Sequence, residues 1–325
     1  METQTLAPRE LSSDEVQPPP TDVAYLTTVL VNVAFVGSPY GRGGPLTDWV
    51  LIDAGIPMQA SRIAQFARER FGDSPPRAIL LTHGHFDHVG SLHALLRTWP
   101  DVPVYAHRLE LPYLTGYAAY PPPDPTVGGG LMARMSPLFP SHPYDFRPHV
   151  MPLPADGVVP FLPDWQWVPT PGHAPGHVSF YRDSDRTLLA GDAFVTQRQE
   201  SLTGVMTMEH VVHGPPTYFT PDWQAAAQSL RRLAALRPSY AITGHGPAVA
   251  NPVLAHDLHL LSTRFEEIAV PRDGRYVRHP ARTDEHGTVW VPPKISDWRP
   301  QLIGALALGA GALAMMATKV KRWRS

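Results

Sequence analysis

The sequence predicts an α/β fold in which helices cover a sheet, and three observations lead to this class. Short apolar runs rich in Val, Ile and Leu recur along the chain with the length of buried strands. Segments with a helical spacing of apolar residues separate these runs. The resulting order is β-α-β-α-β, which is typical of a sheet with helices packed against it.

The N-terminal third of the chain contains the first elements of this order. Its first two strands are expected to pair antiparallel, because a Gly-rich turn at 41–44 lies between them. Gly72 is expected to end the first helix. The predicted strands are 29–36, 49–53, 78–81 and 102–106, and the predicted helices are 61–71 and a segment that continues to Trp99.

A second set of strands and helices begins after residue 163. The turn Asp183-Ser184-Asp185 joins two of these strands. Thr220 is expected to cap a helix that has Pro221 in its first position. The predicted strands are 165–168, 178–181, 187–190 and 240–243, and the predicted helices are 221–236 and 252–268.

Residues 112–163 interrupt the pattern with prolines, aromatic residues and methionines. A long connection inside a compact domain is usually either a functional lid or disordered. The many large apolar side chains favour an ordered segment, so we expect this insertion to pack over the mouth of a site. The alternative is that it only covers the core.

Composition excludes several classes of function. Of 325 residues, 17% are charged and the formal net charge is −2, so no basic surface for nucleic acid is predicted. The chain has no cysteine, which excludes disulfides and thiolate ligands. Any metal must therefore be held by His, Asp or Glu.

The two ends of the chain differ from the part between them. Residues 1–20 are polar and Pro-rich without an apolar core, so we expect a flexible start, no cleaved secretory signal and a cytoplasmic protein. Residues 271–300 are expected to form a polar, Pro-bearing appendage. In the tail at 301–325, residues 302–318 carry no charge and precede a basic end. A helix of that length spans about 25 Å, so it either associates with a membrane or docks on the protein.

The motif Thr82-His83-Gly84-His85-Phe86-Asp87-His88 lies between a predicted strand and a predicted helix. Three histidines and one aspartate are therefore crowded at the carboxyl end of a buried strand. Imidazole and carboxylate suit zinc or iron, so a divalent metal site is the simplest explanation. The alternative is a surface histidine cluster, with Asp87 capping the helix that follows.

Three later strands also end beside a glycine and a potential ligand, namely His173, Asp192 and His245. Together with the motif, they would bring seven ligands to one edge of the fold. That number suits two metal ions with a bridging carboxylate. Asp53 is expected to bind loop amides rather than a metal. His177 is expected to form a hydrogen bond near the ligands rather than to be a ligand.

In combination, these motifs resemble the metallo-β-lactamase fold superfamily, in the branch of glyoxalase II and the lactonases. The resemblance covers roughly residues 21–270 and implies an αββα sandwich. It also implies two zinc ions, with iron or manganese as alternatives. The motifs are His-x-His-x-Asp-His at 83–88, Thr-Pro-Gly-His at 170–173, Gly-Asp at 191–192 and Gly-His-Gly at 244–246. The implied ligands are His83, His85 and His173 for one ion and Asp87, His88 and His245 for the other, with Asp192 bridging.

The resemblance further implies a hydrolase acting on an ester, a thioester or a lactone of a small-molecule acyl substrate. Hydroxide formed between two zinc ions attacks the carbonyl carbon, and Asp87 orients it and passes its proton to the leaving group. Lactonases of this fold carry a tyrosine three residues after the bridging aspartate. This chain has Val195 there, and Tyr218 is a candidate substitute. No helical glutathione-binding domain is recognisable in 271–325.

Two alternatives from other classes stay open. A persulfide dioxygenase of the same fold uses one iron and fewer of these ligands, so metal stoichiometry separates it from the hydrolase. A non-catalytic, membrane-tethered module would be expected to have lost ligands, whereas all seven are present. The diiron flavoproteins of this fold place a carboxylate where this chain has His85. The sequence makes no prediction about the oligomeric state.

Overall fold

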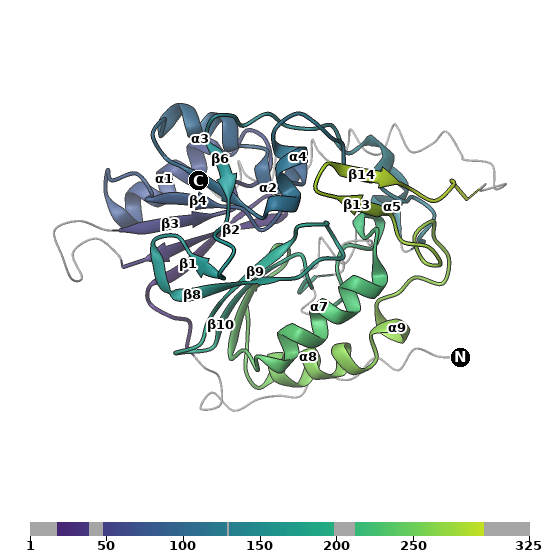
Figure 1. Cartoon of the computed structure of the whole chain (residues 1–325). Coiled ribbons are helices and arrows are strands. Elements are labelled where there is room, and N and C mark those ends of the chain that lie inside the picture. The colour runs from purple at the N-terminus through teal and green to yellow at the C-terminus, as the bar shows by residue number, and fades with distance from the viewer. Residues whose placement is uncertain (1–17, 39–47, 129, 198–211, 296–325) are drawn as a thin grey trace, which may run out of the picture. The chain divides into compact units, whose positions relative to one another are not determined.

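Alternating apolar residues along the strands build two sheets that pack face to face. In β2 (Val31–Gly37), Val33 and Phe35 belong to one apolar cluster and Ala34 and Val36 to another, as expected for side chains on opposite faces of a strand. The computed structural model describes residues 18–38, 48–128, 130–197 and 212–295. The described residues up to Pro293 form the predicted αββα sandwich (Figure 1).

The first sheet follows the order of the chain from its first strand to its sixth. Its strands are β1 (Val23–Thr28), β2, β3 (Trp49–Ile52), β4 (Ala78–Leu80), β5 (Val104–Ala106) and β6 (Val150–Pro152). The pairs β1–β2 and β2–β3 are antiparallel, as predicted for β2 and β3. The pairs from β3 to β6 are parallel, so the carboxyl ends of β3, β4 and β5 lie at one edge.

The second sheet has the order β12-β11-β10-β9-β8-β7. Its strands are β7 (Val158–Val159), β8 (Leu162–Pro169), β9 (Val178–Arg182), β10 (Thr187–Gly191), β11 (Tyr240–Thr243) and β12 (Val249–Ala250). The pair β10–β11 is parallel and the other pairs are antiparallel. Asp192 and His245 consequently follow neighbouring parallel strands.

Helices cover the outer face of each sheet. The helices α1 (Ala60–Phe71) and α3 (Leu92–Thr98) share an apolar cluster with the first sheet, whereas α7 (Trp223–Ala235) and α8 (Val253–Thr263) share one with the second (Figure 1). A third cluster fills the space between the sheets. The shorter helices are α2 (Phe86–Val89), α4 (Leu111–Leu114), α5 (Leu131–Met135), α9 (Phe265–Ile268), η2 (Arg108–Glu110), η3 (Ser136–Leu138) and η4 (Thr217–Phe219).

The first predicted strand, 29–36, is wrong at its start. Val29 and Leu30 form the turn between β1 and β2, and Val29 adopts a left-handed φ of 67°. The strand β1 was missed because this turn contains neither glycine nor proline, the residues that usually mark one.

Three predicted helices also have different bounds. The helix expected to reach Trp99 is broken into α2 and α3 at Gly90, where a Cβ would lie 2.3 Å from Pro57 Cδ. The helix expected at 252–268 is divided at Arg264. The predicted cap Thr220 is wrong, because the Asp222 side chain accepts the hydrogen bond from Ala225 N–H and α7 begins at Trp223.

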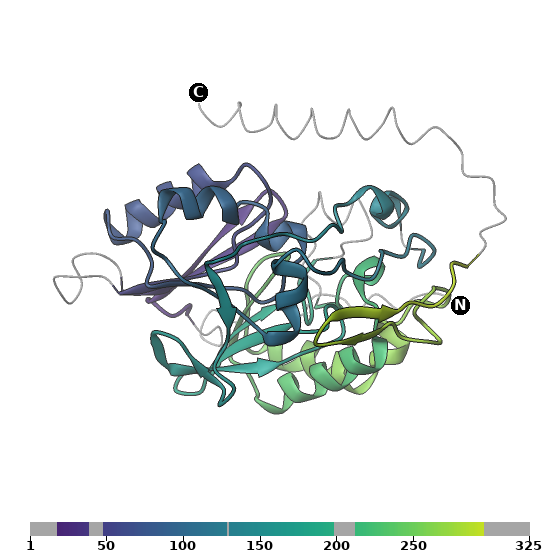
Figure 2. The same ribbon diagram turned by 45° about the horizontal axis from the view of Figure 1, so that its top comes forward.

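The irregular segment 112–163 contributes more to the sheets than its composition predicts. Its last part contains β6 and β7, which extend the first and second sheets respectively. Its first part packs against the hairpin of β13 (Arg282–Asp284) and β14 (Gly287–Trp290), where Thr288 Oγ1 donates to Ala119 O over 2.9 Å (Figure 2).

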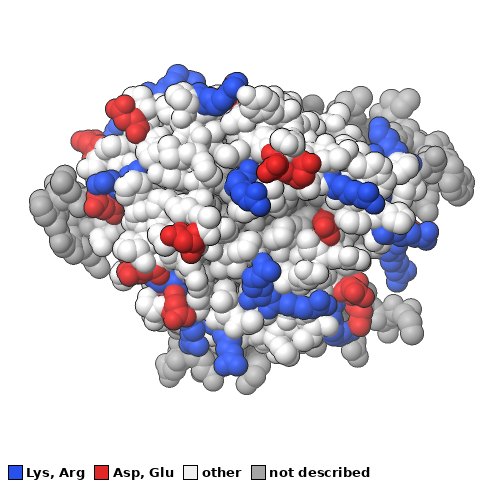
Figure 3. Space-filling view, in the orientation of Figure 1, with Lys and Arg blue, Asp and Glu red and all other residues white. Residues whose placement is uncertain are grey.

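Basic and acidic side chains are interspersed over the face shown in Figure 3.

Two predicted segments lie outside the described residues, namely most of the flexible start and the apolar run 302–318. Within the described ranges, no helix is both long and apolar enough to cross a bilayer. Membrane association through 302–318 stays a prediction.

Candidate metal centre

The motif at 82–88 leaves β4 and enters a helix within a few residues. His85 occupies the N-cap of α2, so Asp87 and His88 lie in its first turn. Gly84 permits close packing under the motif, since a Cβ there would lie 2.6 Å from the hydroxyl of Tyr120. The strand end therefore delivers four polar side chains to one small volume.

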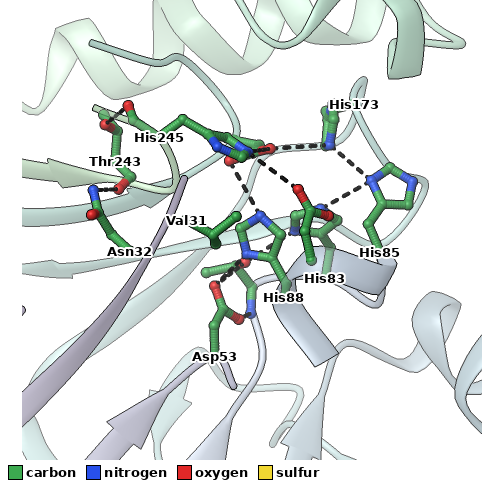
Figure 4. Close-up of polar contacts among 12 residues, drawn as sticks. Val31, Asn32, Asp53, His83, His85, His88, His173, Thr243 and His245 are labelled. Carbon is green, nitrogen blue, oxygen red and sulfur yellow. Dashed lines mark hydrogen bonds and ion pairs between the residues drawn. The ribbon is translucent and has the colours of Figure 1, made fainter. Parts of the chain in front are cut away.

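Three imidazoles form a first ligand group, defined as His83, His85 and His173. His83 Nε2 lies 3.1 Å from His85 Nδ1, and His85 Nδ1 lies 2.9 Å from His173 Nε2 (Figure 4). All three residues are buried. Ring nitrogens from two loops that are far apart in the sequence therefore converge on a common point.

A second ligand group combines Asp87, His88 and His245. His245 Nε2 lies 3.4 Å from Asp87 Oδ2, and one ligand atom from each of the three residues falls within 4.8 Å of the others. Asp87 has the most exposed side chain of the three at 15%, compared with 5% for His245 and 0% for His88. Asp87 is thus the group that solvent or a substrate can reach.

Asp192 lies between the two groups. Its Oδ2 atom is 3.3 Å from His173 Nε2 and 3.2 Å from His245 Nε2, and its Oδ1 atom is 3.5 Å from His88 Nε2. The carboxylate needs space here, because a Cβ on Gly244 would lie 1.9 Å from Oδ1. The structure brings all seven side chains predicted from the sequence together, and their roles as metal ligands stay a prediction.

Hydrogen bonds on the far side of the rings orient three of the histidines. His88 Nδ1 lies 2.8 Å from Asp53 Oδ2 (Figure 4). His245 Nδ1 lies 2.9 Å from the carbonyl oxygen of Leu30. His83 Nδ1 lies 3.0 Å from Thr82 Oγ1. Each bond leaves Nε2 directed at the centre, as is common for histidines that bind metals.

Asp53 has the role that the sequence suggested and one further contact. Its carboxylate accepts hydrogen bonds from Thr82 N–H and Thr82 Oγ1, both at 2.8 Å, in addition to the contact with His88. His177 is a hydrogen-bond partner rather than a member of a ligand group, because Nε2 accepts from Asp192 N–H at 2.9 Å.

Glu110 is a buried acid that the sequence reading missed. Gly84 N–H donates to Oε2 over 2.8 Å and Gly176 N–H donates to Oε1 over 2.7 Å, so one carboxylate joins both loops of the first ligand group. Tyr120 also donates to Oε2, and its ring packs on His85 with 4.5 Å between centroids. Burial raises the pKa of Glu110 to about 6, although these hydrogen bonds oppose the rise. The only local signal was an acid flanked by Leu109 and Leu111.

Burial keeps the first ligand group neutral. It lowers the pKa of His85 to about 4 and holds the pKa values of His83 and His173 well below their usual range. Neutral imidazole is the form that binds a metal, so no proton has to leave this group at pH 7.

Carboxylates give the second group the opposite character. Burial acts to lower the pKa of His245, but Asp192 and Asp87 outweigh it and raise the value to about 10. The pKa of His88 is also raised, by Asp192 and Asp53 against burial. Burial would raise the pKa values of Asp87 and Asp192, yet the neighbouring histidines keep both lowered.

The donor set fits divalent metal ions. His88 Nε2 and Asp192 Oδ1 are buried and have no hydrogen-bond partner among the described residues. The ring nitrogens of the first group face one another at hydrogen-bonding distance, although at most one proton fits between each pair. Buried polar atoms normally have partners, and a cation at each group would satisfy these.

The residues considered for substrate recognition lie in different environments. Val195 is buried and forms an isolated β-bridge with His213, so position 195 offers no hydroxyl. Tyr218 is also buried and lies in η4, next to Phe219, whose ring packs on His85 with 4.9 Å between centroids. A role for Tyr218 in place of the expected tyrosine stays a prediction.

Comparison with known proteins places these residues in a wider context. Residues 28–245 match the family profile "Metallo-beta-lactamase superfamily", a range that contains all seven predicted ligands. The chain is 47% identical over 244 residues to "Probable metallo-hydrolase YflN" of Bacillus subtilis (strain 168), covering 75% of this chain and 90% of that protein.

Two further similarities are more distant. A "Hydroxyacylglutathione hydrolase" of Erwinia tasmaniensis is 33% identical over 117 residues, which covers 36% of this chain and 33% of that protein. The solved structure of "BLEG-1 B3 metallo-beta-lactamase" is 22% identical, with a TM-score of 0.52 over 73% of this chain and 99% of that one. At that identity, the structural likeness supports the fold.

Proposed function

Because the chain belongs to the metallo-beta-lactamase superfamily and resembles a probable metallo-hydrolase, we propose that it hydrolyses the carbonyl group of an ester, a thioester or a lactone. The observation that carries this proposal is the position of Asp192, which lies within 3.3 Å of a histidine from each ligand group. One carboxylate shared by two groups suits a dinuclear centre.

The residues present would hold two divalent ions. The first ion would bind His83, His85 and His173, the second would bind Asp87, His88 and His245, and Asp192 would be shared. Zinc suits these nitrogen and oxygen donors, and iron and manganese are the alternatives. When bound, the ions supply a water that is nucleophilic at neutral pH and stabilise the charge that develops on the carbonyl oxygen.

The chain's own residues would position the reactants and move the proton. Asp87 has a lowered pKa and is therefore ionised at pH 7, so its carboxylate can accept a proton from the attacking water. Its partly exposed side chain can then deliver that proton to the leaving group. Asp53 and Leu30 would hold His88 and His245 in the orientation that this transfer requires.

The acyl class of the substrate has two sources of support. The first is the similarity to a hydroxyacylglutathione hydrolase, a protein named for a thioester substrate. This similarity covers 117 residues, or 36% of this chain. The charge arrangement is the second source, because an ionised Asp87 beside a cationic centre suits attack on a neutral carbonyl carbon.

A substrate panel on the full-length chain tests the proposed function. The purified protein would be loaded with zinc, iron or manganese, and its metal content would be measured by elemental analysis. We expect about two ions per chain and hydrolysis of esters, thioesters or lactones in preference to β-lactams and phosphodiesters. Turnover of phosphodiesters alone would contradict the proposed reaction. One iron per chain with oxygen consumption on a persulfide would support the dioxygenase instead.

A further inference from the structure

We infer that an aromatic wall beside the first ligand group binds an apolar, uncharged acyl group of the substrate. This wall is defined as Phe86, Phe139, Tyr218 and Phe219. The inference rests on the proposed function and adds the chemical class of the acyl group.

Three separate segments supply the wall. Phe86 begins α2, Phe139 follows η3 in the insertion, and Tyr218 and Phe219 lie in η4. The Phe219 ring centroid lies 6.3 Å from that of Phe86 and 6.1 Å from that of Phe139. Phe139 is also 5.7 Å from Phe86 and 5.9 Å from Tyr218. The four rings therefore form one continuous surface.

This surface adjoins the candidate metal centre. The Phe219 centroid lies 4.9 Å from that of His85 and 6.4 Å from that of His173. A group held against Phe219 would therefore lie next to the reacting atoms. The insertion contributes Phe139 to the wall.

The exposure of the phenylalanines separates this wall from the core. Of the eleven phenylalanines, six are at most 1% exposed and five are not buried. Three of those five are Phe86, Phe139 and Phe219. Leaving apolar side-chain area exposed to water is unfavourable. Such exposure is expected where a ligand covers the rings during function.

The surroundings favour an uncharged ligand. Within the described residues, arginine guanidinium groups lie over the rings of Phe71, Phe161 and several other aromatic residues, but no cation lies over the ring of Phe86, Phe139 or Phe219. A carboxylate on the bound group would lose its hydration without gaining a cation. An aliphatic or aromatic acyl chain would instead gain apolar contacts.

The position of Asp87 assigns the wall to the acyl side. The leaving group must lie near Asp87, which would protonate it, and Asp87 belongs with His88 and His245. The wall packs on His85 and His173, on the other side of the centre in Figure 4 from His245. The acyl group is therefore the part of the substrate that faces the wall.

The first test compares esters that share one leaving group. On the metal-loaded, full-length chain, kcat/KM would be measured for p-nitrophenyl acetate, hexanoate and the adipate half-ester, whose chain ends in a carboxylate. We expect hexanoate to exceed both by about tenfold or more. In Phe219→Ala, the ratio of hexanoate to acetate should fall by about tenfold. Phe161→Ala, a partly exposed phenylalanine outside the wall, should leave that ratio unchanged.

The second test does not depend on turnover. Calorimetric binding of hexanamide, an uncharged and poorly hydrolysed probe, should weaken about tenfold in Phe219→Ala and in Phe139→Ala. The Phe139 variant serves if Phe219→Ala does not fold, because Phe139 contacts other rings of the wall and none of the histidines in the first ligand group.

The outcomes separate this inference from the proposed function. Hydrolysis of the acetate without any preference for hexanoate would overturn the acyl subsite and leave the hydrolase standing. A preference for hexanoate that Phe219→Ala leaves unchanged would overturn the assignment of the wall to the acyl side. If no ester, thioester or lactone is hydrolysed, the proposed reaction fails, and unchanged hexanamide binding in both variants would then overturn the subsite independently.

Discussion

The first ligand group contains three neutral imidazoles, whereas the second combines two imidazoles with a carboxylate and lies closer to the N-terminal hairpin. Glu110 and Tyr120 support the first group through Gly84 and Gly176. Asp53 and the Leu30 carbonyl support the second. Asp53 contacts His88 directly and reaches His83 of the first group only through Thr82, so each half of the centre can be weakened largely separately.

The two ligand groups also differ in the hydrogen bonds that they can form when no metal is bound. In the second group, protonated His245 can pair with Asp87 and Asp192, although His88 Nε2 and Asp192 Oδ1 have no hydrogen-bond partner among the described residues. The first group contains no carboxylate, and each pair of its facing ring nitrogens can hold at most one proton. In this group metal would replace contacts between neutral rings, whereas in the second group metal must compete with protons on the histidines.

Asp192→Asn should have the largest effect, because Asp192 is the residue that both groups share. We expect kcat/KM to fall on the order of 10³-fold, through loss of charge at the centre. Elemental analysis should show metal lost from both groups. Asparagine retains the volume, so an unchanged fold by circular dichroism would serve as the control. Activity and metal content at the wild-type level would show that the groups do not need this carboxylate.

Glu110→Gln and Asp53→Asn should each weaken metal binding in a different ligand group. Each removes one orienting carboxylate, and each should weaken metal binding about 10–100-fold, in the first group for Glu110→Gln and in the second for Asp53→Asn. Titration of metal-free protein with Co²⁺, followed by absorbance, measures both affinities. His85→Ala and His245→Ala assign the two steps of the titration. If both carboxylate variants weakened the same step, the separation of the groups would be wrong.

Metal affinity should depend on pH in the second group and hardly at all in the first. The raised pKa of His245, about 10, means that its ring carries a proton below that pH in metal-free protein, and metal must displace it. Affinity there should fall about tenfold per pH unit for each proton displaced as pH decreases from 8 to 6. The pKa of His85 is lowered to about 4, so its ring carries no proton to displace in that range. Equal slopes in a Co²⁺ titration would contradict the difference.

Tyr120→Phe should have the smallest effect. Gly84 N–H loses one acceptor and Glu110 Oε2 loses one donor, but the hydrogen bonds from Gly84 and Gly176 to Glu110 remain, so we expect a loss of about 1–3 kcal/mol in the free energy of unfolding. Denaturation by urea measures this loss. Tyr113→Phe is the matched control, because Tyr113 stacks on Tyr120 but its hydroxyl contacts Thr288 rather than the motif. A large loss of metal from the second group in Tyr120→Phe would be unexpected.

The sequence predicted the candidate site best where residues that can bind a metal directly follow a predicted strand. The ligand types at 83–88 and beside Gly172, Gly191 and Gly244 follow strands, and parallel strands bring their ends to one edge. The αββα sandwich was predicted because the motifs resemble those of a known superfamily, and the comparisons confirm that membership. The exact order of the strands does not follow from periodicity.

The supporting residues could not be predicted in the same way. Glu110 lies in a short helical turn with no motif around it, and its importance depends on Gly84 and Gly176, which are distant in the sequence. The hairpin turn at Val29 was missed because its left-handed backbone contains no glycine. The wall of Phe86, Phe139, Tyr218 and Phe219 also depends on tertiary packing, because its members come from three segments.

The link between His245 and the β1–β2 hairpin has a consequence for how the protein is made. His245 Nδ1 bonds to the Leu30 carbonyl, and Asn32 donates to the carbonyl oxygens of Thr243 and Gly246, so residues more than two hundred positions apart meet at the same spot. A chain emerging from the ribosome cannot complete the second ligand group until His245, the last of its ligands in the sequence, has been translated. Metal capture there should accordingly be a late event in biosynthesis, and chains that terminate before residue 245 should leave the ribosome without it.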